Sequence, residues 1–222
     1  MRWSQGVWSE HRITEAVNDT GMYAALAYGP SGVAPSDDIR EHELYFERLE
    51  DAGLGHIKRP DLLVFRAADM GTVNQAVDAL GGSQELPFVS EDDARMRAIQ
   101  SLALIGVECE NSPWRAAQMP DYGRPLRPMR RLQGKLGLPR SAVLPTVIVK
   151  HEDRGPLRAW QEANGLPVHI WHVFYDMAFG IAFDDVERLI ESGRIEPTEQ
   201  TFQAPGGPTS KKVIFKIYHH HA

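Results

Sequence analysis

Short apolar runs recur along the chain and predict the strands of a buried sheet. The runs are rich in Val, Ile and Leu, and turn-forming or charged residues flank them. The strongest of these signals is the run Leu-Ala-Leu-Ile-Gly-Val at 102–107. The predicted strands cover residues 62–65, 102–107, 146–150, 168–175 and 211–218.

Helical patterns fill most of the intervals between these strands. Gly21 interrupts the first predicted helix, and a loop rich in glycine and proline follows at 29–36. Ser36 or Asp37 is the expected cap of the next helix, which Gly53 ends. The predicted helices cover residues 10–28, 37–52, 72–80, 90–101, 156–164 and 184–192. Because strands and helices interleave, we expect an α/β fold with a mixed central β-sheet flanked by helices, in a single domain over residues 1–222.

Composition restricts the class of protein without naming a function. Hydrophobic residues make up 42% and charged residues 24% of the chain, which is ordinary for a globular domain. The single cysteine, Cys109, excludes an internal disulfide and a cysteine-based zinc cluster, and it fits a reducing compartment. No apolar segment approaches the roughly 18 residues of a membrane span, and no signal core opens the chain. We therefore expect a cytoplasmic protein without a membrane partner.

Three acids lie at the ends of two predicted strands. Asp61 follows Pro60 and begins one strand, whereas Glu108 and Glu110 follow the strongest apolar run. Residues two apart in a strand face the same side, so Glu108 and Glu110 project together and Cys109 points into the core. If the two strands are neighbours, the three carboxylates converge at one edge of the sheet. The alternative is a turn cap at Asp61 and exposed acids at a strand end.

Convergent carboxylates repel one another unless a cation compensates their charge. Oxygen ligands without thiolates indicate Mg²⁺, with Mn²⁺ as a substitute. Such an ion lowers the pKa of a bound water and stabilises charge on a phosphodiester.

These residues resemble the PD-(D/E)XK nuclease superfamily. Pro60-Asp61 is similar to its PD half, and Glu108-Cys109-Glu110 is similar to its (D/E)XK half, in the Glu-X-Glu form that some type II restriction endonucleases carry. The resemblance covers about residues 37–175 and implies a restriction-endonuclease-like core. Two departures stand out: the usual lysine is a glutamate, and Glu108 comes 47 residues after Asp61, an interval that two predicted helices must fill.

The resemblance also implies a role for each site residue. Asp61 and Glu108 would bind Mg²⁺, with the Cys109 backbone carbonyl as a further ligand. Glu110 would be a second-metal ligand or an acceptor for the water proton, so the catalytic set is Asp61, Glu108 and Glu110. A helix acid reaches the site in some relatives, and Glu43 and Glu47 share a helix face, although a solvated face is the simpler reading. The candidates for a displaced lysine are Lys58 and Lys150, and a surface or phosphate-contacting role is the alternative for each.

A basic segment follows the presumed catalytic strand. Residues 124–140 carry six positive charges and no acid, which suits phosphate neutralisation, although a solvated loop carries comparable weight. The net charge of −6 argues only weakly against DNA, since binding needs a local basic surface. The expected DNA-contacting residues are Lys58, Asn111, Ser112, Arg124, Arg127, Arg130, Arg131 and Lys135.

The function predicted from this resemblance is that of a type II restriction endonuclease. It would hydrolyse DNA at a short double-stranded site in a Mg²⁺-dependent reaction, and a homodimer would suit a palindromic site. A cognate DNA methyltransferase would belong to the same system without forming a stable complex. The alternatives are another PD-(D/E)XK nuclease, such as a repair or defence effector, and a non-catalytic DNA-binding domain.

Overall fold

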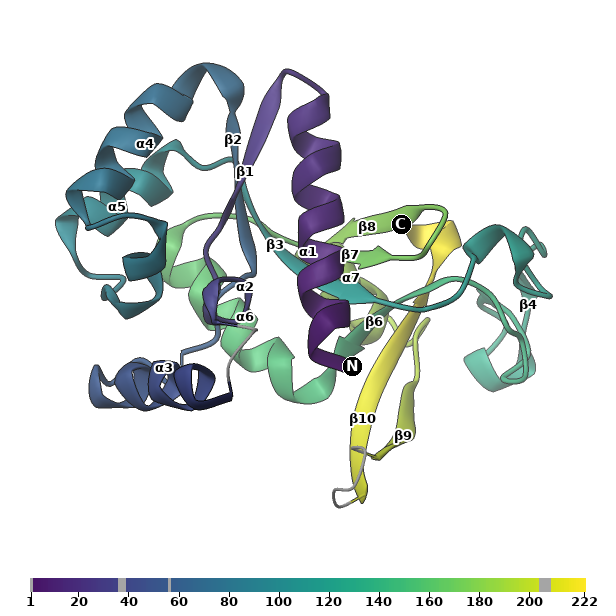
Figure 1. Cartoon of the computed structure of the whole chain (residues 1–222). Coiled ribbons are helices and arrows are strands. Elements are labelled where there is room, and N and C mark those ends of the chain that lie inside the picture. Colours follow the sequence, from purple (N-terminus) through teal and green to yellow (C-terminus); the bar gives the residue numbers. More distant parts are fainter. Residues whose placement is uncertain (1, 36–38, 56, 204–208) are drawn as a thin grey trace. The chain divides into compact units, whose positions relative to one another are not determined.

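The computed structural model describes residues 2–35, 39–55, 57–203 and 209–222 (Figure 1). The chain forms two compact units. Unit 1 comprises Met1–Cys109 and Pro156–Val168, and unit 2 comprises Glu110–Gly155 and His169–Ala222. The sequence-based expectation of one nuclease domain over 1–222 stays a prediction. No helix among the described residues is both long enough and apolar enough to cross a membrane.

The expected α/β class with a mixed central sheet and flanking helices is confirmed. The larger sheet has the strand order β1-β2-β3-β7-β8, and its neighbours β1–β2, β2–β3 and β7–β8 are antiparallel. The direction of β3 and β7 follows from two backbone hydrogen bonds. In unit 1 the Gly106 N–H donates to Pro167 O (2.8 Å), and in unit 2 the Ser112 N–H donates to Val173 O (2.9 Å). From the first bond to the second, the residue numbers increase in both segments, so β3 and β7 run parallel.

Unit 1 is built around strand β2. The first four of its five residues, Leu62 to Phe65, are buried, as a continuous apolar run predicts for a central strand. Helices α4 and α5 belong to the stretch of chain that connects β2 to β3, and they lie side by side (Figure 1). The elements of this unit are α1 (Arg2–Asp19), β1 (Tyr23–Ala27), α2 (Pro30–Val33), α3 (Ile39–Asp51), β2 (Leu62–Arg66), α4 (Met70–Ala79), α5 (Ala94–Leu102), β3 (Ile105–Asn111), which continues into unit 2, and the later part of α6 (His151–Asn164).

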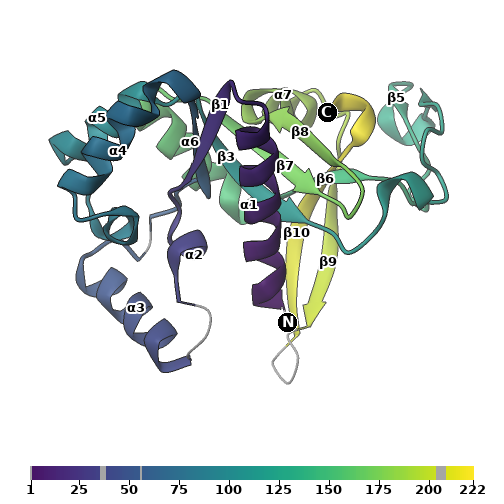
Figure 2. The same ribbon diagram turned by 45° about the horizontal axis from the view of Figure 1, so that its top comes forward.

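Unit 2 contains a three-stranded antiparallel sheet of order β6-β10-β9. Burial alternates along β6, with Val147 and Val149 buried, so one face of this strand packs on the core. Figure 2 shows β9 and β10 as a long hairpin. The elements are β4 (Arg127–Pro128), β5 (Leu136–Gly137), β6 (Thr146–Lys150), the start of α6, β7 (Val168–Val173), β8 (Ala178–Ala182), α7 (Phe183–Glu191), β9 (Pro197–Gln203) and β10 (Thr209–Tyr218).

The first predicted helix is wrong in its second half. Helix α1 ends at Asp19, and the alanine-rich stretch after Gly21 forms strand β1. Gly21 has a φ of +66°, and the Asn18 side chain accepts a hydrogen bond from the Ala25 N–H (3.0 Å), which leads the chain out of the helix. Pairing of β1 with the buried β2 outweighs the helical propensity of alanine.

Other element boundaries differ from the predicted ones. Strand β3 begins at Ile105 because α5 continues to Leu102, so Glu108 and Glu110 lie within the strand and not after its end. Helix α6 begins at His151 and accepts Pro156 near its start, and the loop predicted at 29–36 contains α2. Strands β8 and β9 had no counterpart in the prediction. The expected caps Ser36 and Asp37 lie outside the described residues.

Candidate metal centre

Close backbone contacts in unit 1 hold Pro60 and Asp61 in place. The N–H groups of Tyr28 and Gly29 both donate to the Asp61 carbonyl oxygen, at 2.8 and 3.0 Å. A Cβ atom at Gly29 would lie 2.9 Å from Pro60 O, and one at Gly106 would lie 2.8 Å from Pro60 Cγ. Either contact would force a shift, so the absence of side chains at both positions lets the dipeptide sit where it does.

The register of β2 and β3 places Asp61 beside Glu108. Leu62 lies opposite Val107, and one step further along the antiparallel ladder Asp61 comes opposite Glu108. The Asp61 carboxylate accepts a hydrogen bond from the Cys109 N–H (2.7 Å), and both acids are buried. The two predicted strands are therefore neighbours, as the carboxylate hypothesis required. Cys109 itself is half-buried, so its expected place in the core is wrong; β3 is only partly covered from this residue onward.

Lys58 neutralises the buried Glu108. The Lys58 Nζ donates to Glu108 Oε1 at 2.5 Å, from the segment that leads into Pro60. A buried carboxylate is costly without a partner, so this lysine stabilises Glu108 in its ionised form. Lys58 is therefore in direct contact with Glu108, an acid of the candidate site.

Glu10 is a buried acid that the sequence analysis did not single out. It lies on α1, three residues before Ile13 and seven before Val17, both of which are buried. Burial, and after it the negative charge of Asp61, raise the pKa of Glu10 to about 8, although the positive charge of Lys58 opposes the rise. A glutamate on the apolar stripe of an amphipathic helix is the signal that identifies it.

The helix acids expected from the sequence lie elsewhere. Glu43 and Glu47 are exposed on α3, and Glu43 pairs with Arg40 at 3.6 Å. Their environment is that of a solvated helix face, which was the simpler reading of the pattern.

In unit 2, Lys150 links two further acids. Its Nζ donates to Glu110 Oε1 at 2.6 Å and lies 3.6 Å from Asp153 Oδ2. Lys150 is the last residue of β6, and Asp153 lies in the first turn of α6, so the junction of strand and helix brings both to the same place. Asp153 was not predicted; an acid directly after a strand that ends in lysine is the signal for it.

Three of these acids can hold a metal ion. Glu108, Glu110 and Asp153 each offer a carboxylate oxygen, and these atoms lie within 4.8 Å of one another. Glu108 and Glu110 are two residues apart on β3 and so face the same side, as the sequence predicted. A set of carboxylate oxygens without a thiolate is a set of hard donors. Asp61 is not among the three, and the Cys109 N–H engages its carboxylate.

His172 is a buried titratable group of unit 2. It lies on β7, and its Nδ1 is buried and makes no hydrogen bond within the described part of the chain. Burial lowers the pKa of His172 to about 4, and the positive charge of Lys150 acts in the same direction. The imidazole is therefore neutral near pH 7.

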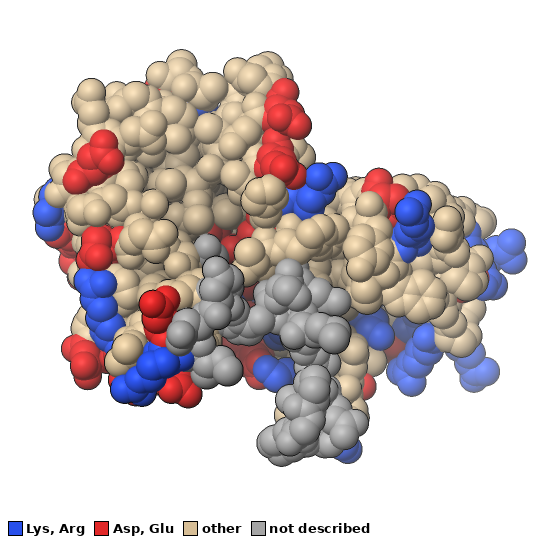
Figure 3. Space-filling model, viewed as in Figure 1, with Lys and Arg blue, Asp and Glu red and all other residues tan. Residues whose placement is uncertain are grey.

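The predicted DNA-contacting residues of the basic segment have different environments. Lys and Arg side chains gather over the segment that carries β4 (Figure 3). Arg127 and Arg130 are exposed, and the described residues offer neither of them an ion pair. The other basic residues have partners: Arg124 pairs with Asp121 (2.7 Å), Arg131 pairs with Glu196, and Lys135 donates to Ser192 O (2.5 Å).

The two polar residues that follow Glu110 are both half-buried. Asn111 ends β3, and the Ser112 N–H is engaged by Val173 O. Their expected role in DNA contact stays a prediction.

Comparison with known proteins adds no relative. No family model matches the chain, no curated protein matches it, and no solved structure matches it. The functional argument therefore rests on the chemistry of the site.

Proposed function

We propose that this protein is a Mg²⁺-dependent endodeoxyribonuclease of the PD-(D/E)XK kind, acting as a type II restriction endonuclease at a short double-stranded site. The observation that carries the proposal is the set of carboxylate oxygens of Glu108, Glu110 and Asp153 within 4.8 Å of one another. Glu108 and Glu110 lie on β3, and Pro60-Asp61 directly precede its neighbour β2, the pairing that the superfamily resemblance calls for.

The residues of the chain divide the work of such a reaction. Glu108, Glu110 and Asp153 would hold the cation. The chemistry supplied by a bound cation is a lowered pKa of water and neutralisation of charge on the phosphodiester. Asp61 accepts the Cys109 N–H and so fixes the strand between the two glutamates. The Cys109 carbonyl as a further ligand stays a prediction.

Lys150 supplies the positive charge that the Glu-X-Glu motif lacks. In the superfamily a lysine occupies the third position of the motif, whereas here Glu110 stands there and receives the ammonium group of Lys150 from β6. We assign to Lys150 the orientation of the attacking water and the stabilisation of charge that develops on the phosphate. Lys58, on Glu108, is the second lysine named by the sequence.

The proposed substrate is double-stranded DNA. The exposed Arg127 and Arg130 are the strongest phosphate-contacting candidates of the basic segment, since neither is committed to an acid in the described part of the chain. A homodimer with one active site for each strand is part of the proposal, and so is a methyltransferase in the same system.

A cleavage assay tests the proposal. The purified protein is incubated with plasmid and phage DNA in Mg²⁺ or in EDTA, beside Glu110→Gln and the exposed α3 variant Glu47→Gln. We expect discrete fragments in Mg²⁺ with the wild type and with Glu47→Gln, and intact DNA in EDTA and with Glu110→Gln. A smear would indicate a nonspecific nuclease of the same superfamily. Intact DNA throughout, together with no heat of Mg²⁺ binding in calorimetry, would refute the nuclease proposal.

One observation favours a second candidate, a DNA-binding domain without catalysis. Lys58 and Lys150 each neutralise one of the glutamates on β3, so these acids are compensated without a cation. A non-catalytic domain would retard DNA equally in Mg²⁺ and in EDTA and leave it uncut.

A further inference from the structure

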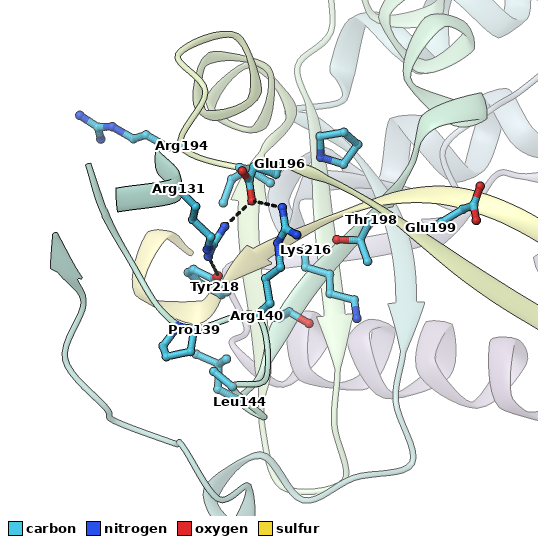
Figure 4. A pocket seen from close by; sticks show the side chains of 14 residues that line it. Arg131, Pro139, Arg140, Leu144, Arg194, Glu196, Thr198, Glu199, Lys216 and Tyr218 are labelled. Carbon is cyan, nitrogen blue, oxygen red and sulfur yellow. Dashed lines mark hydrogen bonds and ion pairs between the residues drawn. The ribbon is translucent and has the colours of Figure 1, made fainter. Parts of the chain in front are cut away.

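Unit 2 contains a polar cavity that the proposed nuclease chemistry does not use. Its volume is about 310 Å³, at the lower end of the range for small-molecule sites. Residues from the segment after Arg130, from the start of β9 and from the end of β10 line it (Figure 4). None of the lining residues belongs to the carboxylate cluster of the candidate metal centre. We call this cavity the basic pocket.

Positive charge dominates the basic pocket. Four basic side chains line it against two acidic ones, although the whole chain carries a net charge of −6. The basic residues come from separate parts of unit 2: Arg131, Arg140, Arg194 and Lys216. An excess of cations in a concave site attracts an anionic ligand.

Glu196 fixes the arginines in position. Figure 4 shows Arg131 and Arg140 converging on its carboxylate. The carboxylate accepts hydrogen bonds from Nη1 of Arg131 and from Nη2 of Arg140 (3.3 Å). Burial alone would raise the pKa of Glu196, but the hydrogen bonds from the two arginines lower it below its ordinary value. Arg131 Nη2 also donates to Leu138 O (2.5 Å) and to the Tyr218 hydroxyl (3.4 Å). The guanidinium of Arg131 is thus held in place before any ligand arrives.

Donor capacity remains after these contacts. The Nε–H of Arg131 is buried and makes no hydrogen bond within the described part of the chain, and such an unpaired donor is costly in a folded protein. Arg140 is 79% exposed and uses one nitrogen on Glu196. Lys216 has no ion pair among residues 2–35, 39–55, 57–203 and 209–222. A ligand with several acceptor oxygens can use the exposed donors of Arg140 and Lys216 together.

The rest of the wall suits the remainder of such a ligand. Pro139, Leu144 and Pro197 give apolar contacts, and Thr146 and Thr198 give hydroxyl groups. Arginine recognises phosphate through paired N–H donors, and Arg131, Arg140 and Lys216 reach the wall of the pocket from separate segments of the chain.

We propose that the basic pocket binds a phosphate ester that carries a sugar or base, with the phosphate beside Arg131, Arg140 and Lys216. The phosphate source is a free mononucleotide or a nucleotide of a DNA strand, and these share the chemistry that the pocket recognises. The proposal does not depend on the nuclease activity, because no residue of the pocket belongs to the metal centre.

Calorimetric titration of the full chain in EDTA tests this site without the metal centre. The probes are inorganic phosphate, deoxyadenosine 5′-monophosphate and a short DNA duplex. The variants are Arg140→Gln and Lys216→Gln, and the control is Lys212→Gln on the same strand as Lys216 but outside the pocket. Thermal unfolding checks that each variant is folded.

We expect saturable binding of the mononucleotide, tighter than that of inorganic phosphate, and a loss of about tenfold for each pocket variant. Lys212→Gln should bind like the wild type. If the duplex alone binds with the same sensitivity to Arg140→Gln and Lys216→Gln, the phosphate comes from a DNA strand. Absence of saturable binding for every probe, or an equal loss in Lys212→Gln, would overturn the proposal.

Discussion

The two lysine–glutamate pairs on β3 stand only two residues apart but lie in different surroundings. The Glu108 side chain is 7% exposed and receives Lys58 within unit 1. The Glu110 side chain is 21% exposed and receives Lys150 within unit 2, where the lysine also lies near Asp153. The Glu108 carboxylate is therefore nearly inaccessible to solvent, whereas the Glu110 carboxylate is partly accessible and its lysine also lies near Asp153.

This difference separates structural compensation from chemistry. A carboxylate as buried as Glu108 needs its counter-charge whenever the protein is folded, so Lys58 contributes mainly to stability. Glu110 loses less if its lysine turns away, because water can reach it. Within the proposed function, we therefore assign the role of acting on the phosphate to Lys150 and not to Lys58.

Removal of the Glu108 charge is expected to have the largest effect. Glu108→Gln keeps the shape of the side chain but weakens the cation site, so DNA cleavage should fall by at least about a thousandfold. Gel assays over time measure the rate, and calorimetry measures Mg²⁺ affinity, which should fall as well. Glu47→Gln, the same change on the exposed face of α3, should leave both values unaltered. A wild-type rate for Glu108→Gln would remove this residue from the site.

Substitution of each lysine should affect a different property: cleavage for Lys150 and stability for Lys58. Lys150→Met should lower the cleavage rate by about a hundredfold with little change in the free energy of unfolding. Lys58→Met should lower the free energy of unfolding by about 1–3 kcal/mol, because the buried Glu108 loses the donor of its hydrogen bond. Urea unfolding and single-turnover cleavage of both variants provide the two readouts. If Lys58→Met alone abolished cleavage in a stable protein, the roles of the lysines would be reversed.

The buried Glu10 should give a smaller, pH-dependent effect. The folded protein keeps this carboxyl protonated up to about pH 8, whereas the unfolded chain releases the proton near pH 4.5. The folded state therefore binds more protons between these values, and its stability falls as pH rises through this window. Glu10→Gln lacks this loss and should gain about 1 kcal/mol or more on the wild type between pH 5 and pH 8.

Urea unfolding in EDTA measures this effect without divalent cations. Glu15→Gln, on the same helix but exposed, is the matched control and should follow the wild type at each pH. Parallel pH profiles for Glu10→Gln and the wild type would show that Glu10 titrates normally.

Much of the fold and half of the site follow from local sequence patterns. The apolar run after Asp61 and the run before Glu108 predicted two strands, and the register of β2 and β3 shows that these strands are neighbours, which the sequence had left as a condition. Strand β1 was missed because its alanines favour a helix in isolation and become a strand only against β2.

The missed acids depend on tertiary structure. Glu10 matters because of the face that α1 turns inward, and Asp153 matters because of where β6 ends. The residues around each acid carry a local signal, but the groups that each acid meets are set by the fold. Lys150 was named from the sequence as a candidate, but its partner Glu110 lies 40 residues earlier and could not be inferred from spacing.

The two glycines that border Pro60 and Asp61 have a consequence for how this site is encoded. Gly29 and Gly106 contribute no donor, acceptor or charge, yet a single methyl group at either position would collide with Pro60. The position of Asp61 therefore depends on the absence of a side chain at two residues that are far apart in the sequence. A design that places this site in another scaffold must keep glycine at both positions as well as the reactive side chains.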